Sequence, residues 1–220
     1  ARICSYDMLP SGWSVRGLLE RIAHARPGFH ALIDTGALVT GMTNEEVATF
    51  LLKAGLPGMD GVVFLDQYDR KMIVVRGSFK VLKLAQCGIA MGRRFSFYDQ
   101  VHTTGMDIKQ VINATAVLTL GKDMVFRDYA QGAYRMRQIA TGQRIRLFVI
   151  PEVLELVRAA VSAGLGVAQP MLDSLAGGGG SSGAGGGGAR RVAMPEDGGV
   201  ATAAEARGEA MTSQMLQDVA

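Results

Sequence analysis

Two polar segments near the middle of the chain carry residue types that could bind a phosphate or a sugar hydroxyl. The first is a Thr-Thr-Gly-Met-Asp turn at residues 103–107, which follows the apolar segment FSFY. Gly105 would let the backbone approach a phosphate closely, because glycine has no Cβ. Asp107 can accept a hydrogen bond from a ribose hydroxyl or orient an arginine. We therefore assign Thr104, Gly105 and Asp107 to a cofactor-binding turn; the alternative is an ordinary Asx-type turn.

The second segment is a predicted helix over residues 126–139. Asp128, Gln131 and Arg135 recur in it at helical spacing, so they should share one face, and we expect that face to be exposed. On an unbroken helix Arg137 would point about 200° away from Arg135. Arginine suits phosphate because its planar fork carries a permanent charge. The alternative role for Arg135 is a surface ion pair with Asp128 or a neighbour.

A third set of residues, Cys87, His102 and Asp99, combines a thiol, an imidazole and a carboxylate. Nucleophilic catalysis needs a thiolate beside a base, with a third group that orients the base. These residue types permit such chemistry, but Cys87 stands at no evident helix start, and a buried free cysteine is far commoner. We interpret the turns at 34–36 and 66–70 as ordinary polar turns.

The scaffold that must position these segments alternates apolar strands with helices. The expected strands cover residues 30–34, 61–66, 72–76, 95–98, 116–120 and 144–150. The expected helices cover residues 12–25, 43–54, 78–86, 126–139 and 151–163. A capping box, Thr43 with Glu46, opens the second of these helices. Such alternation implies crossover connections, so we predict an α/β fold, a three-layer sandwich with a mostly parallel sheet.

Composition divides the chain into four parts. Residues 1–28 form an expected N-terminal helical segment, 29–163 the α/β domain, and 164–176 a connector. A Gly/Ala-rich tail at 177–220 opens with GGGGSSGAGGGG. This tail buries too little apolar surface to offset its ordering entropy, so it should be disordered. Because the chain begins with Ala1 rather than Met, we expect it to be part of a longer protein.

Charge and cysteine content narrow the class of protein. The 220 residues carry a formal net charge of +3, and 48% of them are hydrophobic, enough for a sizeable core. Basic residues outnumber acidic ones between Lys122 and Arg146, which indicates either a solvated face or contact with phosphate. Two cysteines far apart in sequence indicate a reducing compartment, so we expect an intracellular protein, cytoplasmic or nuclear. We expect no membrane span, because no run of about 18 apolar residues is present.

The order of the polar turn, the AVLTL strand, the Gln/Arg helix and the RIRLFVI strand resembles the last third of the second RecA-like domain of superfamily-two helicases and translocases. In that family a T-x-G-x-D turn and a Q-x-x-x-R helix face ATP bound by a different domain. The helix pattern there is roughly Q-x-x-G-R-x-G-R. Gln131 and Arg135 match its first residue and its first arginine. Tyr134 replaces the glycine, and Gln138 stands where the second arginine would be.

The resemblance implies roles for the residues that match. Arg135, with Gln131, would stabilise charge on a transferring γ-phosphoryl group. Residues that would contact the nucleotide are Thr104, Gly105, Asp107 and Arg137. The implied cofactor is ATP with magnesium. Because the chain has no G-x-x-x-x-G-K-[ST] loop, it would bind this cofactor only together with an upstream phosphate-binding domain, its expected partner.

Whole phrases within residues 29–152 are also similar to a family of very large eukaryotic proteins catalogued with ubiquitin thiolesterases of the ovarian-tumour type. They include ALIDTGALVTG, FYDQVHTTGMDIKQ and RDYAQGAYRMRQ. This likeness implies a RecA-like module at 29–163 within a large hydrolase, inactive when alone. The alternative is part of a ubiquitin-specific cysteine hydrolase in which this module binds or scaffolds, with ubiquitin or nucleic acid as further candidate partners. Nothing around Cys87 resembles the Asp-Gly-Asn-Cys motif of those proteases.

Overall fold

The computed structural model describes residues 4–103 and 107–165. Thr104 and Gly105 lie outside these described residues, as do most of the predicted connector and the whole predicted tail. Contacts divide the chain into two units; the first ends at Leu156 and the second begins at Val157. The fold below is that of the first unit. No helix in the described part of the chain is long and apolar enough to cross a membrane.

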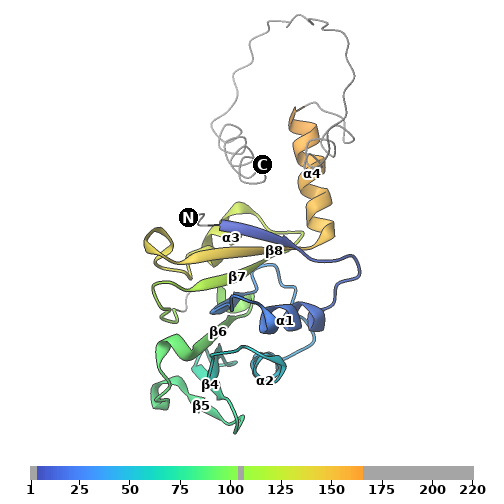
Figure 1. Ribbon diagram of the computed structural model, residues 1–220. Coiled ribbons are helices and arrows are strands. Elements are labelled where there is room, and N and C mark those ends of the chain that lie inside the picture. Colours follow the sequence, from blue (N-terminus) through green and yellow to red (C-terminus); the bar gives the residue numbers. More distant parts are fainter. Residues whose placement is uncertain (1–3, 104–106, 166–220) are drawn as a thin grey trace, which may run out of the picture. The chain divides into compact units, whose positions relative to one another are not determined.

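Eight strands form one sheet in the order β1-β8-β7-β2-β6-β3-β4-β5 (Figure 1). The strands are β1 (Cys4–Met8), β2 (Ala31–Ile33), β3 (Gly61–Leu65), β4 (Lys71–Val75), β5 (Val81–Lys83), β6 (Arg94–Tyr98), β7 (Thr115–Leu120) and β8 (Arg144–Val149). All pairs are parallel except β3 with β4 and β4 with β5. The predicted α/β class and mostly parallel sheet are therefore confirmed.

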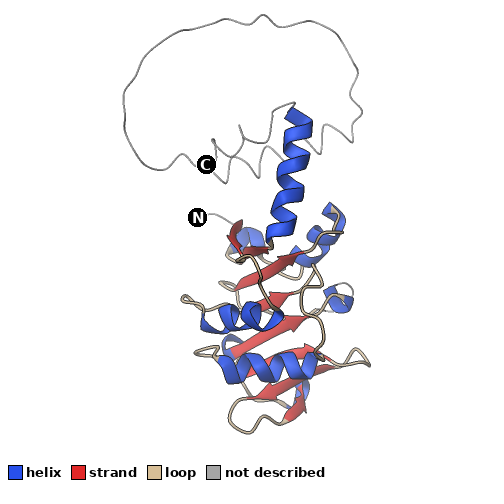
Figure 2. Cartoon of the chain, turned by 90° about the vertical axis from the view of Figure 1, so that its right-hand side faces the viewer, coloured by secondary structure: helices blue, strands red, loops and turns tan. Residues whose placement is uncertain are grey.

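Helices α1 (Val15–His24) and α2 (Asn44–Ala54) lie side by side across one face of the sheet (Figure 2). They connect β1 to β2 and β2 to β3, so both crossovers advance in the same direction along the sheet. Helix α3 (Phe126–Ala133) connects β7 to β8 in the opposite direction. Because crossovers between parallel strands are right-handed, α3 covers the other face. Helix α4 (Pro151–Leu165) follows β8.

Both ends of α2 are capped by specific hydrogen bonds. At its start the predicted capping box is confirmed: Thr43 Oγ1 accepts from the Glu46 N–H at 3.2 Å, and the Glu46 carboxylate accepts from the Thr43 N–H at 2.7 Å. At its end the chain leaves the helix at Gly55, as predicted. The Arg76 guanidinium, just after β4, donates to backbone carbonyls at and beyond this end. They belong to Leu52, Gly55, Leu56 and Met59.

The structure differs from the sequence prediction at both edges of the sheet. The segment at residues 1–28 contains the predicted helix as α1, but it also contains a strand that was not predicted, because Cys4–Met8 forms edge strand β1 and pairs in parallel with β8. The helix predicted at 78–86 is absent. Instead Gly77 (φ 85°) and Phe79 (φ 52°) turn the chain back so that β5 pairs with β4. Pairing with a neighbouring strand outweighs local propensity in both segments.

The strand register brings three connecting segments to one edge of the sheet. Ile33 at the end of β2 lies opposite Tyr98, the last residue of β6, and opposite Leu118 near the end of β7. The crossover after β2 runs to one side and the crossover after β7 runs to the other. Adjacent strands β2 and β7 therefore form a topological switch point, the place where open α/β sheets bind ligands at the carboxyl ends of their strands.

Candidate ligand site at the carboxyl edge of the sheet

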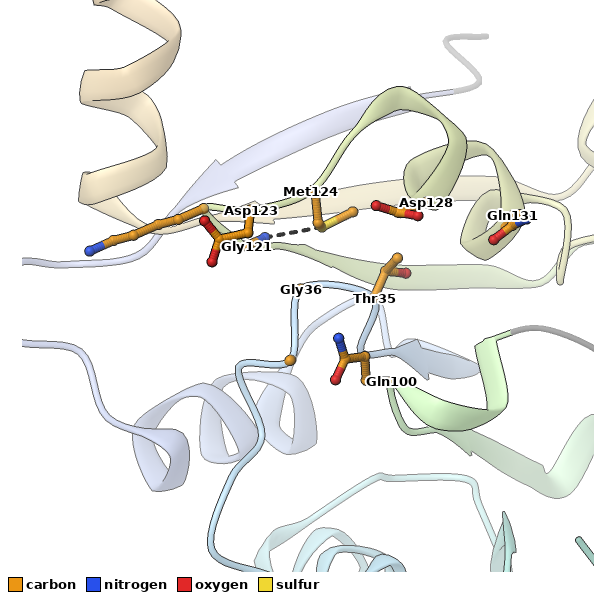
Figure 3. A pocket seen from close by; sticks show the side chains of 10 residues that line it. Thr35, Gly36, Gln100, Gly121, Asp123, Met124, Asp128 and Gln131 are labelled. Carbon is orange, nitrogen blue, oxygen red and sulfur yellow. Dashed lines mark hydrogen bonds between the residues drawn. The ribbon is translucent and has the colours of Figure 1, made fainter.

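A cavity of about 310 Å³ lies at this switch point, between the segments that follow β2 and β7 (Figure 3). Side chains from three connections reach it. The lining residues are Thr35, Gly36, Ala37, Gln100, Gly121, Lys122, Asp123, Met124, Asp128 and Gln131. In Figure 3, Asp128 and Gln131 of α3 lie on one side of Thr35, and Gln100 lies on the opposite side. The predicted turn at 34–36 is thus part of the candidate site, which sequence reasoning missed.

The two loops of the cavity approach each other backbone to backbone at Gly36 and Gly121. A Cβ added to Gly36 would lie 2.5 Å from the Gly121 nitrogen, and one added to Gly121 would lie 2.4 Å from the Gly36 oxygen. Thr119 Oγ1 joins the same two strand ends, because it accepts from the Gly36 N–H at 3.0 Å and donates to Asp34 Oδ1 at 2.6 Å. Glycine at both positions is therefore required for the loops to meet.

Asp34 anchors the loop that follows β2. Asp34 is only 1% exposed, and its carboxylate accepts hydrogen bonds from the backbone N–H groups of Leu38 (3.0 Å) and Val39 (2.9 Å). Burial raises the pKa of this carboxyl above its usual value, while its hydrogen bonds, led by that from Thr119, act in the opposite direction. Between these anchors Ala37 adopts a left-handed conformation with φ 52°. Such a conformation is strained for alanine and is held by the surrounding hydrogen bonds.

One wall of the cavity consists of Thr35 and helix α3. Thr35 is 5% exposed, and its buried hydroxyl makes no hydrogen bond to any of the described residues. The hydroxyl lies against Gly132, where an added Cβ would come within 2.2 Å of it. Asp128 accepts the Val125 N–H at 3.1 Å and so caps the start of α3, while Gln131 is exposed at the cavity. The glycine at 132 lets α3 approach the end of β2.

The predicted polar helix face is wrong, because α3 ends at Ala133 rather than at residue 139. After Gly132 the backbone continues in a tighter turn, with N–H groups of Arg135 and Met136 donating to carbonyls three residues earlier. Glycine has low helix propensity, which favours this early end. Arg135 consequently leaves the face of Gln131 and is buried, at 8% exposure. The expectation that Arg135 is exposed beside Gln131 is therefore incorrect.

Two other predicted residues, Asp107 and Arg137, are brought together. Their side chains form an ion pair, with 3.4 Å between Arg137 Nε and Asp107 Oδ1, and both are about half exposed. The adjoining residue Ile108 donates its N–H to the Tyr98 hydroxyl (3.0 Å) and accepts from it (3.2 Å). The pKa of Tyr98 is raised to about 12, chiefly by burial, while the hydrogen bond with Ile108 acts in the opposite direction. Tyr98 thus fixes this segment beside the end of β6.

The residues considered for thiol chemistry do not form a catalytic set. Asp99 hydrogen-bonds to Nδ1 of His102, and Asp69 to its Nε2 at 2.8 Å. Both ring nitrogens face carboxylates, so neither is available to accept a thiol proton. Cys87 Sγ instead accepts from the Ile89 N–H at 3.5 Å. His102 serves to connect the β3–β4 turn with the segment after β6.

No group of three or more His, Cys, Asp or Glu side chains among the described residues is arranged to hold a metal ion. Comparison of the chain with protein-family models, with curated proteins and with solved structures gives no match. The helicase resemblance therefore depends on the quoted sequence phrases, and function must be argued from the geometry of the site.

Proposed function

We propose that this chain is a RecA-like module that contributes polar side chains to a nucleotide site completed by a second, phosphate-binding module. The observation that carries the proposal is the Asp107–Arg137 ion pair, which adjoins Ile108 where that residue bonds to the Tyr98 hydroxyl. The family resemblance implies nucleotide contact for both partners, and the pair leaves Arg137 about half exposed. Asp107 can therefore orient a guanidinium that remains accessible to a phosphate.

The arginine that faces phosphate in this proposal is Arg137, in place of the buried Arg135. A planar fork with permanent charge can stabilise a transferring phosphoryl group, and a partner carboxylate fixes its orientation. Gln131 would act from the cavity wall. The cavity by itself fits a triphosphate poorly, because Asp123 and Asp128 oppose a single Lys122. ATP with magnesium would accordingly be held by the second module.

ATP turnover by the protein that joins this chain to a phosphate-binding module tests the proposal. Arg137→Ala should lower turnover on the order of a thousandfold, as for other trans-acting arginines. Arg137→Lys should rescue little, since a point charge cannot reproduce the fork. Arg16→Ala is the matched control, because Arg16 is also exposed and also pairs with a single carboxylate, that of Glu20 at 3.5 Å, but it lies on α1 and does not line the cavity. Unchanged turnover in Arg137→Ala would refute the proposal.

A further inference from the structure

The switch-point cavity has a size and a lining that restrict its ligand. A volume of about 310 Å³ lies at the lower end of small-molecule sites, which span roughly 300–1,000 Å³. This size suits a nucleoside or a monosaccharide better than a larger cofactor. Asp123 and Asp128 outnumber Lys122 in the lining, so a ligand that enters as an anion would meet net negative charge.

The polar groups of the lining favour a ligand with neighbouring hydroxyls. A carboxylate only accepts hydrogen bonds and can take two hydroxyl protons at once, whereas carboxamides both donate and accept. Asp128 supplies the carboxylate; Gln131 and Gln100 supply carboxamides. An acidic side chain on the ribose hydroxyls is how open α/β sheets commonly hold a nucleoside at a switch point.

Thr35 provides an independent indication that a polar ligand belongs here. A buried hydroxyl without a partner is costly, and Thr35 is 95% buried with no hydrogen bond among the described residues. The hydroxyl rests against Gly132 in the cavity wall, and rotation about Cα–Cβ to another staggered position would move it away from Gly132. A hydroxyl of the ligand would then satisfy it.

We infer that the cavity binds the vicinal diol of a nucleoside, with Asp128 accepting from the sugar hydroxyls and Thr35 and Gln131 completing the contact. The inference rests on the proposed function, which makes a nucleotide the source of the diol. It adds that this chain holds the nucleoside part of that nucleotide. The phosphates lie outside the cavity, towards the second module.

Isothermal titration calorimetry of the chain with adenosine tests this inference, with backbone amide shifts of Gly36 and Gly121 locating the site. Adenosine should bind saturably and shift both amides. Removing one hydroxyl of the diol, as in 2′-deoxyadenosine, should weaken binding at least about tenfold, since the polar groups of the site lose a hydrogen-bond partner. AMP should bind no more tightly than adenosine. Equal affinity for adenosine and 2′-deoxyadenosine, or no binding of either, overturns the inference.

Two variants separate ligand contact from a structural role. Asp128→Asn keeps an oxygen for the Val125 N–H but should weaken adenosine binding about tenfold and abolish the preference over 2′-deoxyadenosine. Thr35→Val should also weaken binding, yet leave the ligand-free protein as stable or more stable, because it removes an unsatisfied buried hydroxyl. Asp60→Asn is the matched control, because Asp60 precedes β3 at the opposite edge and pairs with Arg93. If Thr35→Val binds adenosine normally, Thr35 has no part in the site and the inference fails.

A further ligand identifies the source of the diol. Methyl β-ribofuranoside presents the sugar without a base, so binding as tight as that of adenosine would overturn the nucleoside assignment. The outcomes also separate the two proposals. If adenosine binds normally but Arg137→Ala leaves ATP turnover unchanged, the proposed function is contradicted and the cavity assignment is not. If Arg137→Ala lowers ATP turnover but adenosine does not bind, the cavity assignment is contradicted and the proposed function is not.

Discussion

Asp34 determines the conformation of the loop that forms one side of the cavity. Its buried carboxylate binds two backbone N–H groups of that loop and the hydroxyl of Thr119 on the neighbouring strand. A single side chain therefore couples the ends of β2 and β7. Because burial raises its pKa, Asp34 loses its proton at a higher pH in the folded protein than in the unfolded protein. Its contribution to stability therefore depends on pH and can be measured.

Replacing Asp34 by Asn should flatten part of the dependence of stability on pH. The folded-state pKa of Asp34 lies above the unfolded value of 3.8, so the folded state binds the proton more tightly. This contribution to the free energy of unfolding is therefore fully present below about pH 4 and is lost as pH rises through the folded pKa. Urea unfolding across this range should show a downward slope in the parent that Asp34→Asn lacks.

The control for this measurement is Asp60→Asn, because the hydrogen bond from Arg93 lowers the pKa of the Asp60 carboxyl in the folded protein. Its contribution has the opposite sign: it is present above the unfolded pKa and is lost as pH falls through the folded pKa. Identical pH slopes for the parent and Asp34→Asn would contradict the role assigned to Asp34 burial.

Residue types at the site could be predicted from the sequence better than their orientation. Gln131 does line the cavity at the carboxyl ends of the strands, because strand order and polar turns set that edge. The orientation of Arg135 could not be predicted, since it depends on the helix ending after Gly132 as α3 packs on Thr35. That contact joins segments distant in sequence, and its one local signal is the low helix propensity of Gly132.

At the scale of elements, Arg76 is expected to stabilise the end of α2 through its shape as well as its charge. Its guanidinium donates to the carbonyls of Leu52, Gly55, Leu56 and Met59 at 2.6–3.0 Å. Arg76→Lys keeps the charge but cannot reach all these acceptors, so it should lower the free energy of unfolding by about 1–3 kcal/mol. Chemical denaturation measures this loss.

Arg16→Lys provides the comparison for Arg76. Arg16 is exposed on α1, where it pairs with Glu20 at 3.5 Å, and exposed pairs of this kind contribute about 0.3–0.5 kcal/mol. A loss in Arg76→Lys no larger than that in Arg16→Lys would show that the carbonyl contacts contribute little.

Elements with strong local signals matched the sequence predictions, and elements defined by pairing did not. The α2 capping box and the buried strands β3 and β7 were expected from local pattern. Strands β1 and β5 lie at the two edges of the sheet and are only partly buried, so their apolar patterns are weak. A short edge strand is recognised by its partner rather than by its own residues.

At the scale of the whole molecule, removing residues 177–220 should leave the folded domain unchanged. Composition gives the reason, because GGGGSSGAGGGG and the Ala-rich sequence after it offer little apolar surface to bury. A chain ending at residue 176 should therefore unfold at the same temperature as the parent and bind adenosine equally well. A lower unfolding temperature, or weaker adenosine binding, would show that the tail contacts the domain.

The pairing of β1 with β8 also constrains the order in which the domain can assemble during synthesis. β1 is the first described strand, yet its only partner is the last one, formed by Arg144–Val149. At translation rates of about 5–20 residues per second, β1 would wait on the order of ten seconds for that partner to be made. During this interval its backbone N–H and C=O groups are unpaired and open to chaperones or to other chains. Pairing of β1 with β8 is therefore a late step in the assembly of the sheet.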